Sequence, residues 1–138
     1  MRPEREFALE WLHKARNDLL SAKAVLASEY GITDVPCFHA QQAVEKALKG
    51  LLTWHGVSFG KTHDLMVLLA AGVEIIPDLE DLRSICEELS EFAVDVRYPG
   101  GISEPPEGEA ERFVSESEAI LGRIKKEMGT SNGFPGRL

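Results

Sequence analysis

The sequence predicts an all-α protein, an up-and-down antiparallel bundle of four long helices and one short helix. Three observations support this fold class. Apolar residues recur at steps of three and four through most of the chain, as they do along one face of an α-helix. No segment alternates apolar and polar residues over the length of a strand, and no internal repeat is visible. The connections between the helical segments are short, which favours antiparallel neighbours.

The first helix is predicted over residues 3–28, where apolar residues form a heptad-like seam. The seam comprises Ala8, Leu12, Ala15, Leu19, Ala22 and Leu26. Pro3 suits a first helical turn, and Gly31 follows the predicted end, where glycine commonly closes a helix. The second helix is predicted over residues 34–56, with Pro36 tolerated in its first turn.

The third and fourth helices are predicted from residues that commonly cap the N-terminus of a helix. Thr62 is the predicted N-cap of a short third helix that runs to Gly72. Asp78 is the predicted cap of the fourth helix, over residues 79–97, and Asp81 follows it at a spacing that resembles a capping box. A Pro-Gly-Gly run then breaks the chain. The apolar face of the fourth helix comprises Leu82, Ile85, Leu89, Phe92, Ala93 and Val96.

The fifth helix is predicted from Glu109 to Met128. Its expected buried face comprises Ala110, Phe113, Val114, Ser117, Leu121 and Ile124. The glycine-rich run that follows has no helical pattern, so residues 129–138 are expected to form a flexible C-terminal tail. We therefore expect one helical domain over residues 1–128, followed by a tail.

Composition narrows the possible functions. With 138 residues, of which 43% are hydrophobic and 28% charged, the chain can bury one core. A net charge of -8 and a pI of about 5.0 argue against a general nucleic-acid binder, although a local basic patch is compatible with both. No signal peptide and no membrane-spanning run is visible. Cys37 and Cys86 are expected to be buried free thiols, which fits a cytoplasmic protein with no membrane association.

The second predicted helix has one distinctive polar face. His39, Gln42, Lys46, Lys49 and Thr53 recur at steps of three or four, so they share one side of the helix. A surface helix ordinarily carries such a face only because it is solvated. This face, however, has two lysines, a histidine and no acid in a chain with excess acid. It could therefore hold an anionic group.

Four motifs follow one another along the chain. They are Trp11 with Ala15, Asp18-Leu19 and Ala22, then FHAQQAVEKALKGLL, then KTHDL, then RYP at residues 97–99. In this order they resemble the HEPN family (higher eukaryotes and prokaryotes nucleotide-binding) over about residues 8–127. The resemblance implies a helical bundle that usually dimerises and frequent pairing with a minimal nucleotidyltransferase, often as a toxin–antitoxin module. Many family members are metal-independent RNases.

The chain departs from the ribonuclease members of the family it resembles. Those members carry an arginine, four to six intervening residues and a histidine at the end of the helix that corresponds to residues 79–97. Here Arg97 is followed by no histidine, because His63 is the last one in the chain. A histidine can move protons near neutral pH, whereas an arginine stays protonated and is a poor general base. We therefore predict no catalytic residue of the usual kind.

Arg97 and Tyr98 are the site residues that the resemblance indicates, because RYP marks the region near the family's dimer cleft. A guanidinium and a phenol suit a nucleotide, the first by bidentate contact with phosphate and the second by its aromatic face. Spacing alone favours a contact of Arg97 with the last carbonyls of its helix, and Tyr98 could simply cover the helix end. The candidate ligand-binding residues are Arg97, Tyr98, His39, Lys46, Lys49 and His63.

His63 lies in KTHDL, at the start of the third predicted helix, and two interpretations are open. Lys61, His63 and the helix N-terminus could together hold an anion. Alternatively, Thr62 only caps the helix while Asp64 supports its first turn. The second interpretation is favoured, and the two are compatible.

Glu45 projects beside the apolar arc of the second helix, as Gln41 does. A buried carboxylate is costly unless it is paired. We expect a partner such as Arg16, Lys23 or Arg97 on a neighbouring helix, or a place at a dimer interface. A catalytic acid is the less favoured alternative, because no second carboxylate or metal ligand stands at a suitable spacing.

The chain contains no sequence motif typical of metalloenzymes, cofactor-dependent enzymes or enzymes with a covalent nucleophile. The four histidines are scattered, and neither HExxH nor CxxC occurs, so no metal is expected. Phosphate-loop, dinucleotide-binding and GxSxG signatures do not occur either, so no cofactor and no covalent nucleophile are predicted.

The sequence therefore predicts a non-catalytic or degenerate HEPN protein that binds a nucleotide, RNA or a partner nucleotidyltransferase. A homodimer is expected, because Ile85, Phe92 and Val96 give the fourth helix more apolar surface than one bundle face needs. The alternative is a metal-independent RNase toxin whose proton-transfer group is His39 or His63. A third interpretation is a purely structural partner domain.

Overall fold

The computed structural model describes residues 3–95 and 104–129, and in these ranges all regular secondary structure is helical. The predicted all-α fold is thereby confirmed. In chain order the helices are α1 (Pro3–Ala27), α2 (Asp34–Trp54), α3 (Leu65–Ile75), the 3-10 helix η1 (Pro77–Leu82), α4 (Arg83–Asp95) and α5 (Glu107–Glu127). Residues 130–138 of the predicted tail lie outside the described residues. No described helix is long and apolar enough to cross a membrane.

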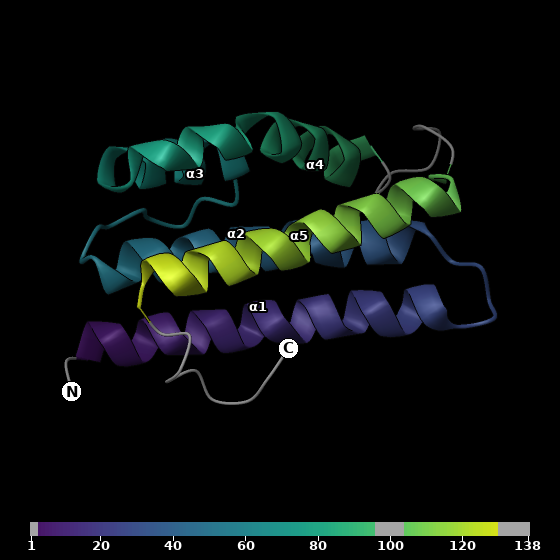
Figure 1. Ribbon diagram of the computed structural model, residues 1–138, viewed down its shortest axis with the longest axis horizontal. Coiled ribbons are helices and arrows are strands. Elements are labelled where there is room, and N and C mark those ends of the chain that lie inside the picture. The colour runs from purple at the N-terminus through teal and green to yellow at the C-terminus, as the bar shows by residue number, and fades with distance from the viewer. Residues whose placement is uncertain (1–2, 96–103, 130–138) are drawn as a thin grey trace.

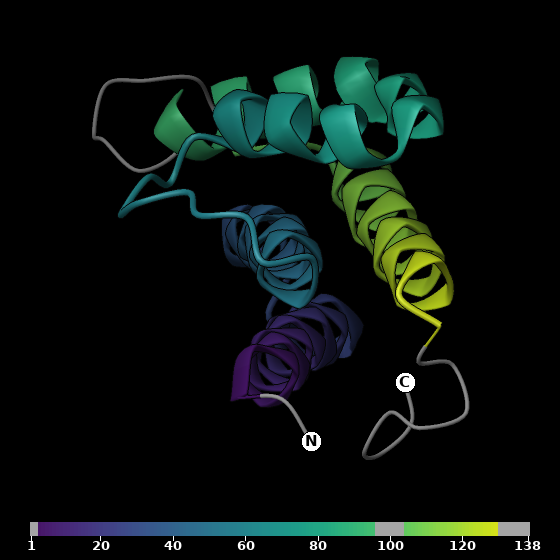
Figure 2. The same ribbon diagram turned by 90° about the vertical axis from the view of Figure 1, so that its left-hand side faces the viewer.

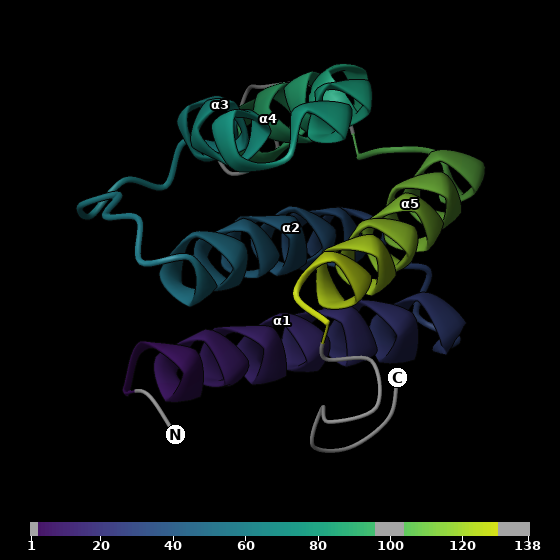
Figure 3. The same cartoon turned by 60° about the vertical axis from the view of Figure 1, so that its left-hand side comes forward.

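The central helix is α2, which contacts α1, α3, α4 and α5. Figure 1 shows α1 on one side of α2, and α3 with α4 on the opposite side. The end-on view in Figure 2 shows α5 along one flank of α2. On the other flank no described helix covers α2, and the connection over residues 55–64 lies on that side (Figures 2 and 3). We call this side of α2 the open flank.

The packing of α1 on α2 follows from small and apolar residues that face each other. The predicted seam of α1 is confirmed, since its members from Ala8 to Ala22 are fully buried. Gly50 lets the two helices approach closely, because a Cβ at this position would meet the carbonyl oxygen of Ala8 and Leu12 Cδ2 at 3.3 Å each. This close contact brings side chains of α1 beside the open flank.

The start of α3 differs from the prediction. Asp64, not Thr62, is the N-cap, and its carboxylate accepts a hydrogen bond of 2.9 Å from the Met66 backbone N–H. Thr62 Oγ1 instead accepts from the Asp64 N–H at 3.1 Å. Both hydroxyl and carboxylate are good caps, so local sequence alone did not decide between them. Because the helix is capped by Asp64, His63 lies in the connection before it.

The start of α4 also differs. The predicted helix over residues 79–97 with Asp78 as its cap is divided into η1 and α4, and α4 begins only at Arg83. The cause is a tertiary contact, because Leu79 of η1 is fully buried and packs against Gly72 of α3. That contact turns the chain back across α3 before α4 can begin. Val96 and Arg97, the predicted end of this helix, lie outside the described residues.

The apolar residues of α4 are mostly used inside one chain. Leu89 and Cys86 are buried, and the Phe92 ring packs edge-on against Phe113 of α5, with 5.5 Å between centroids. Ile85 is half-buried beside α5. Part of the surface that predicted a homodimer is therefore covered within the subunit, and the homodimer stays a prediction.

Both cysteines are buried and free, as predicted. Burial raises the pKa of the Cys37 thiol to about 12, and the nearby carboxylates of Glu109 and Asp34 add to the shift. Burial likewise raises the pKa of Cys86 to about 11. Because only the thiolate is nucleophilic, both residues are core residues and not reactive sites.

Candidate functional site

The first of two charged clusters on the open flank is built around Asp18 of α1. Its Oδ1 lies 2.8 Å from His39 Nδ1, and its Oδ2 accepts a hydrogen bond of 2.5 Å from Lys46 Nζ. The Asp18 side chain is only 11% exposed, whereas the side chains of His39 and Lys46 are 30% and 24% exposed. A buried carboxylate thus holds two partly exposed basic side chains. We call these three residues the Asp18 cluster.

The second cluster is built around Glu45 of α2. Its Oε2 accepts a hydrogen bond of 3.1 Å from Lys49 Nζ, four residues along the same helix, and lies 2.9 Å from His63 Nδ1. The Glu45 and Lys49 side chains are 3% and 6% exposed, so this ion pair is buried. His63 is 79% exposed and bonds the carboxylate from the connection between α2 and α3. We call these three residues the Glu45 cluster.

Two aromatic rings complete the surroundings of Lys49. Its Nζ lies 5.2 Å from the ring centroid of Trp11 and 5.7 Å from that of Phe59. The two rings also pack edge-on at 6.3 Å. A desolvated ammonium is stabilised by the negative face of an aromatic ring, so these contacts help to offset the cost of burying Lys49. They also tie α1 to the connection that carries His63.

The carboxylates set the orientation of both histidine rings. An ionised carboxylate only accepts hydrogen bonds, so the Nδ1 atoms of His39 and His63 carry the hydrogen. Nε2 of each ring is then an acceptor when the ring is neutral and a donor when it is charged. No described residue bonds either Nε2. These atoms can therefore exchange a proton with a ligand or donate to one.

One oxygen of the Glu45 cluster is unsatisfied. Glu45 Oε1 is buried and has no hydrogen-bond partner among residues 3–95 and 104–129. A buried acceptor without a donor is unfavourable, and such groups concentrate at sites with a functional role. The Glu45 carboxylate is therefore held by one oxygen only, through Lys49 and His63.

The structure corrects the prediction of an acid-free cationic face. His39, Lys46 and Lys49 do share the open flank, but Asp18 reaches them from α1 and Glu45 from the edge of the same face. Periodicity describes one helix and not the charges that a neighbouring helix supplies. With neutral histidines, the two lysines and two carboxylates balance. Within these two clusters, net positive charge comes only from protonation of the histidines.

The predicted ligand-binding residues are brought together in part. His39 and Lys46 meet at Asp18, and Lys49 and His63 meet at Glu45. Arg97 and Tyr98, the remaining two, lie outside the described residues.

Sequence reasoning suggested a different set of partners for Glu45, and it missed the structural role of Asp18. Among the suggested partners, Lys23 pairs instead with Glu118 of α5. Asp18 was visible only as one letter of a family motif. The available signal was its position, because Asp18 precedes Leu19 and so lies directly beside the apolar seam of α1. A carboxylate at such a place needs a cationic partner.

Comparisons with known proteins agree with this fold. A family model described as HEPN domain matches residues 8–128. The fold is similar to the crystal structure of an archaeal HEPN homologue, with 25% sequence identity and a TM-score of 0.70. The similarity covers 88% of this chain and 97% of the archaeal one. A comparison with curated proteins finds no match.

Removing one charge or both tests whether Glu45 and Lys49 form a buried ion pair. We expect Glu45→Gln to lower the free energy of unfolding by about 3 kcal/mol, because Lys49 is left buried without its counter-charge. The double variant Glu45→Gln/Lys49→Met should recover most of that loss. Glu118→Gln, which breaks a half-exposed pair with Lys23, is the control and should cost about 1 kcal/mol or less. Urea denaturation followed by circular dichroism measures all three, and equal costs at positions 45 and 118 would contradict the assignment.

Proposed function

The chain belongs to the HEPN domain family, and from this membership we propose that it is a non-catalytic HEPN protein that binds a nucleotide or RNA at the open flank of α2. The observation that supports the proposal most directly is the Asp18 cluster. There, His39 and Lys46 are partly exposed and are held in place by one buried carboxylate.

Such an arrangement suits a phosphate group. Lys46 has three N–H donors and uses one of them toward Asp18. Since the side chain is already ordered by that bond, little further entropy is lost when a ligand binds. His39 Nε2 becomes a second donor when the ring is charged. Both residues bond the same carboxylate, so their remaining donors can serve one phosphate.

The charge balance favours a small ligand. The whole chain has a net charge of -8, which repels a long polyanion. The two clusters on the open flank gain net positive charge only when His39 and His63 are protonated. The partly exposed rings of Trp11 and Phe59 lie beside the Glu45 cluster and offer an aromatic surface for a base. A mononucleotide or the end of an RNA fits this combination better than a duplex.

The family resemblance supports the wider part of the proposal. It adds Arg97 and Tyr98 to His39, Lys46, Lys49 and His63 as ligand-binding residues. It also supports a homodimer in the cytoplasm that pairs with a minimal nucleotidyltransferase in a toxin–antitoxin module.

A second candidate function, metal-independent RNA cleavage, is supported by one specific observation. The buried Glu45 carboxylate orients His63, and Asp18 orients His39 in the same way. A carboxylate that fixes a histidine through Nδ1 and leaves Nε2 toward the substrate is the arrangement of many general bases. His63 could then accept the proton of a ribose 2′-hydroxyl without the Arg-x4-6-His motif.

Binding measurements test the first function. We expect ATP or a short single-stranded RNA to bind the wild-type protein, and Lys46→Gln to weaken binding about tenfold because one charged hydrogen bond to phosphate is lost. Lys126→Gln removes an exposed lysine near the end of α5 and should leave the affinity unchanged. Isothermal titration calorimetry measures both. The proposal fails if neither ligand binds, or if the two variants weaken binding equally.

A cleavage assay tests the second function. If His63 is the base, the purified protein cleaves RNA in the presence of EDTA, and His63→Gln slows the reaction by about 100-fold or more. His55→Gln is the matched control, because His55 is an exposed histidine in the same connection with no carboxylate partner among the described residues. Intact RNA after prolonged incubation with the wild-type protein would remove this candidate and leave the non-catalytic one.

A further inference from the structure

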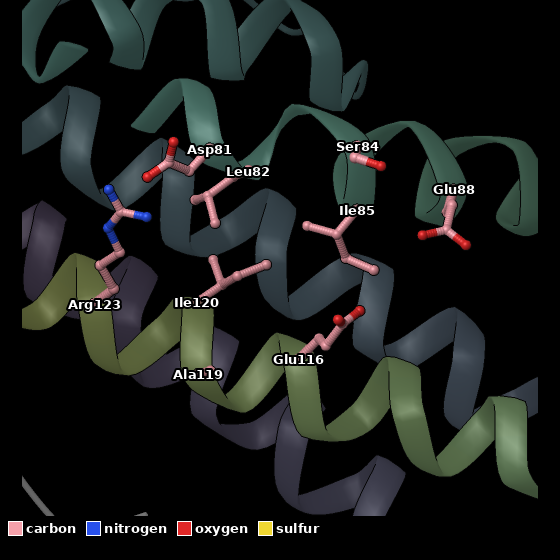
Figure 4. Close-up of a pocket in the computed structure, with 9 residues that line it drawn as sticks. All are labelled: Asp81, Leu82, Ser84, Ile85, Glu88, Glu116, Ala119, Ile120 and Arg123. Carbon is pink, nitrogen blue, oxygen red and sulfur yellow. The ribbon is translucent and has the colours of Figure 1, made fainter. Parts of the chain in front are cut away.

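A groove lies between α5 and the wall that η1 and α4 form together (Figure 4). It encloses about 410 Å³. Leu82 and Ile85 line it from one wall and Ile120 from the other, and Figure 4 shows these three side chains directed into the space between the helices. The interior of the groove is therefore apolar.

Direct contacts between the two walls close the groove at both ends. At one end Arg112 Nη2 of α5 lies 2.7 Å from Glu88 Oε1 of α4. At the other end Arg123 Nη2 donates a hydrogen bond of 2.7 Å to the backbone carbonyl of Asp78. These contacts are ten residues apart on one wall and eleven on the other, which is about three helical turns or roughly 16 Å. The groove is therefore a short notch and not a channel along which an extended chain could lie.

The rim of the notch is acidic. Asp81, Glu88 and Glu116 line it, against Arg123 as the only lining cation among the described residues. Arg112, at the end of the notch, bonds both Glu88 and Glu116. Asp81 forms no hydrogen bond or ion pair with any described residue. The wall formed by residues 77–91 contains one arginine and six acids, namely Asp78, Glu80, Asp81, Glu87, Glu88 and Glu91. An apolar interior with this rim complements an apolar side chain flanked by basic ones.

We propose that this notch docks a basic amphipathic helix from a partner protein. The partner helix inserts one or two apolar side chains between Leu82, Ile85 and Ile120. Its lysines or arginines contact first Asp81, the lining acid that has no partner among the described residues, and then Glu116, which Arg112 also bonds. Side chains three or four residues apart on a helix lie about 5–6 Å from each other, so two of them fit within the length of the notch. This inference is independent of the ligand proposed for the open flank.

The charges also argue against the other occupants. A phosphate-bearing ligand or an anionic surface would be repelled by the rim. A second copy of this chain, related by a twofold axis through the notch, would bring Asp81, Glu88 and Glu116 against the same three acids. A helix of opposite charge is the occupant that the electrostatics select.

The test uses a labelled synthetic 18-residue peptide of leucine, lysine and alanine, with its leucines along one helical stripe, as the probe. Ala119 lines the notch and is exposed, so Ala119→Lys fills it and adds a like charge without removing a core contact. We expect fluorescence anisotropy to show binding to the full chain, weakened about tenfold or more by Ala119→Lys. Ala70→Lys, at an exposed position of α3, is the matched control and should bind as the wild type does.

A charge pair of variants completes the experiment. Asp81→Asn should weaken peptide binding several-fold. Glu111 is an exposed acid of α5 outside the notch, so Glu111→Gln should leave peptide binding unchanged. Absence of binding, equal weakening by Ala119→Lys and Ala70→Lys, or equal weakening by the two acid variants would overturn the proposal. So would a wild-type dimer in sedimentation that Ala119→Lys dissociates, because the notch would then be a self-interface.

Discussion

The central position of α2 is the constraint on which the rest of the structure depends. Four helices pack against α2, so most of its surface is apolar, and yet it carries Glu45, Lys46 and Lys49 close together. Charges at such a place are tolerated only when they are paired. The pairing comes partly from α2 itself, through Glu45 and Lys49, and partly from Asp18 of the neighbouring helix α1.

The same constraint gives the protein two surfaces of opposite character. On the open flank, buried carboxylates hold Lys46, His39 and His63, whose side chains are partly or largely exposed, which suits a small anion. Between α4 and α5, a short apolar notch has an acidic rim, which suits a cation-bearing partner. The net charge of -8 favours binding of a basic partner at the notch. On the open flank it favours small anions, which need only local positive charge, over long polyanions.

The sequence predicted the long helices well because each has an extended apolar face. The second helix, for example, was predicted over residues 34–56 and ends two residues earlier, at Trp54. It predicted helix starts less well, since the buried contact of Leu79 with α3 overrides the local capping signal at Asp78. For the site, periodicity placed the cations on one face correctly. It could not supply Asp18, which belongs to another helix, so the predicted cationic face proved to be a set of ion pairs. The histidines therefore decide its charge, not the lysines.

The most direct test of the central claim is side-chain nitrogen NMR of the four histidines during titration with AMP. If the clusters form the ligand site, His39 and His63 carry their hydrogen on Nδ1 in the free protein, and their Nε2 resonances shift on addition of AMP. His13 and His55, both exposed and outside the clusters, serve as internal controls and should not move. Shifts of equal size at all four histidines, or at His13 and His55 alone, would contradict the account.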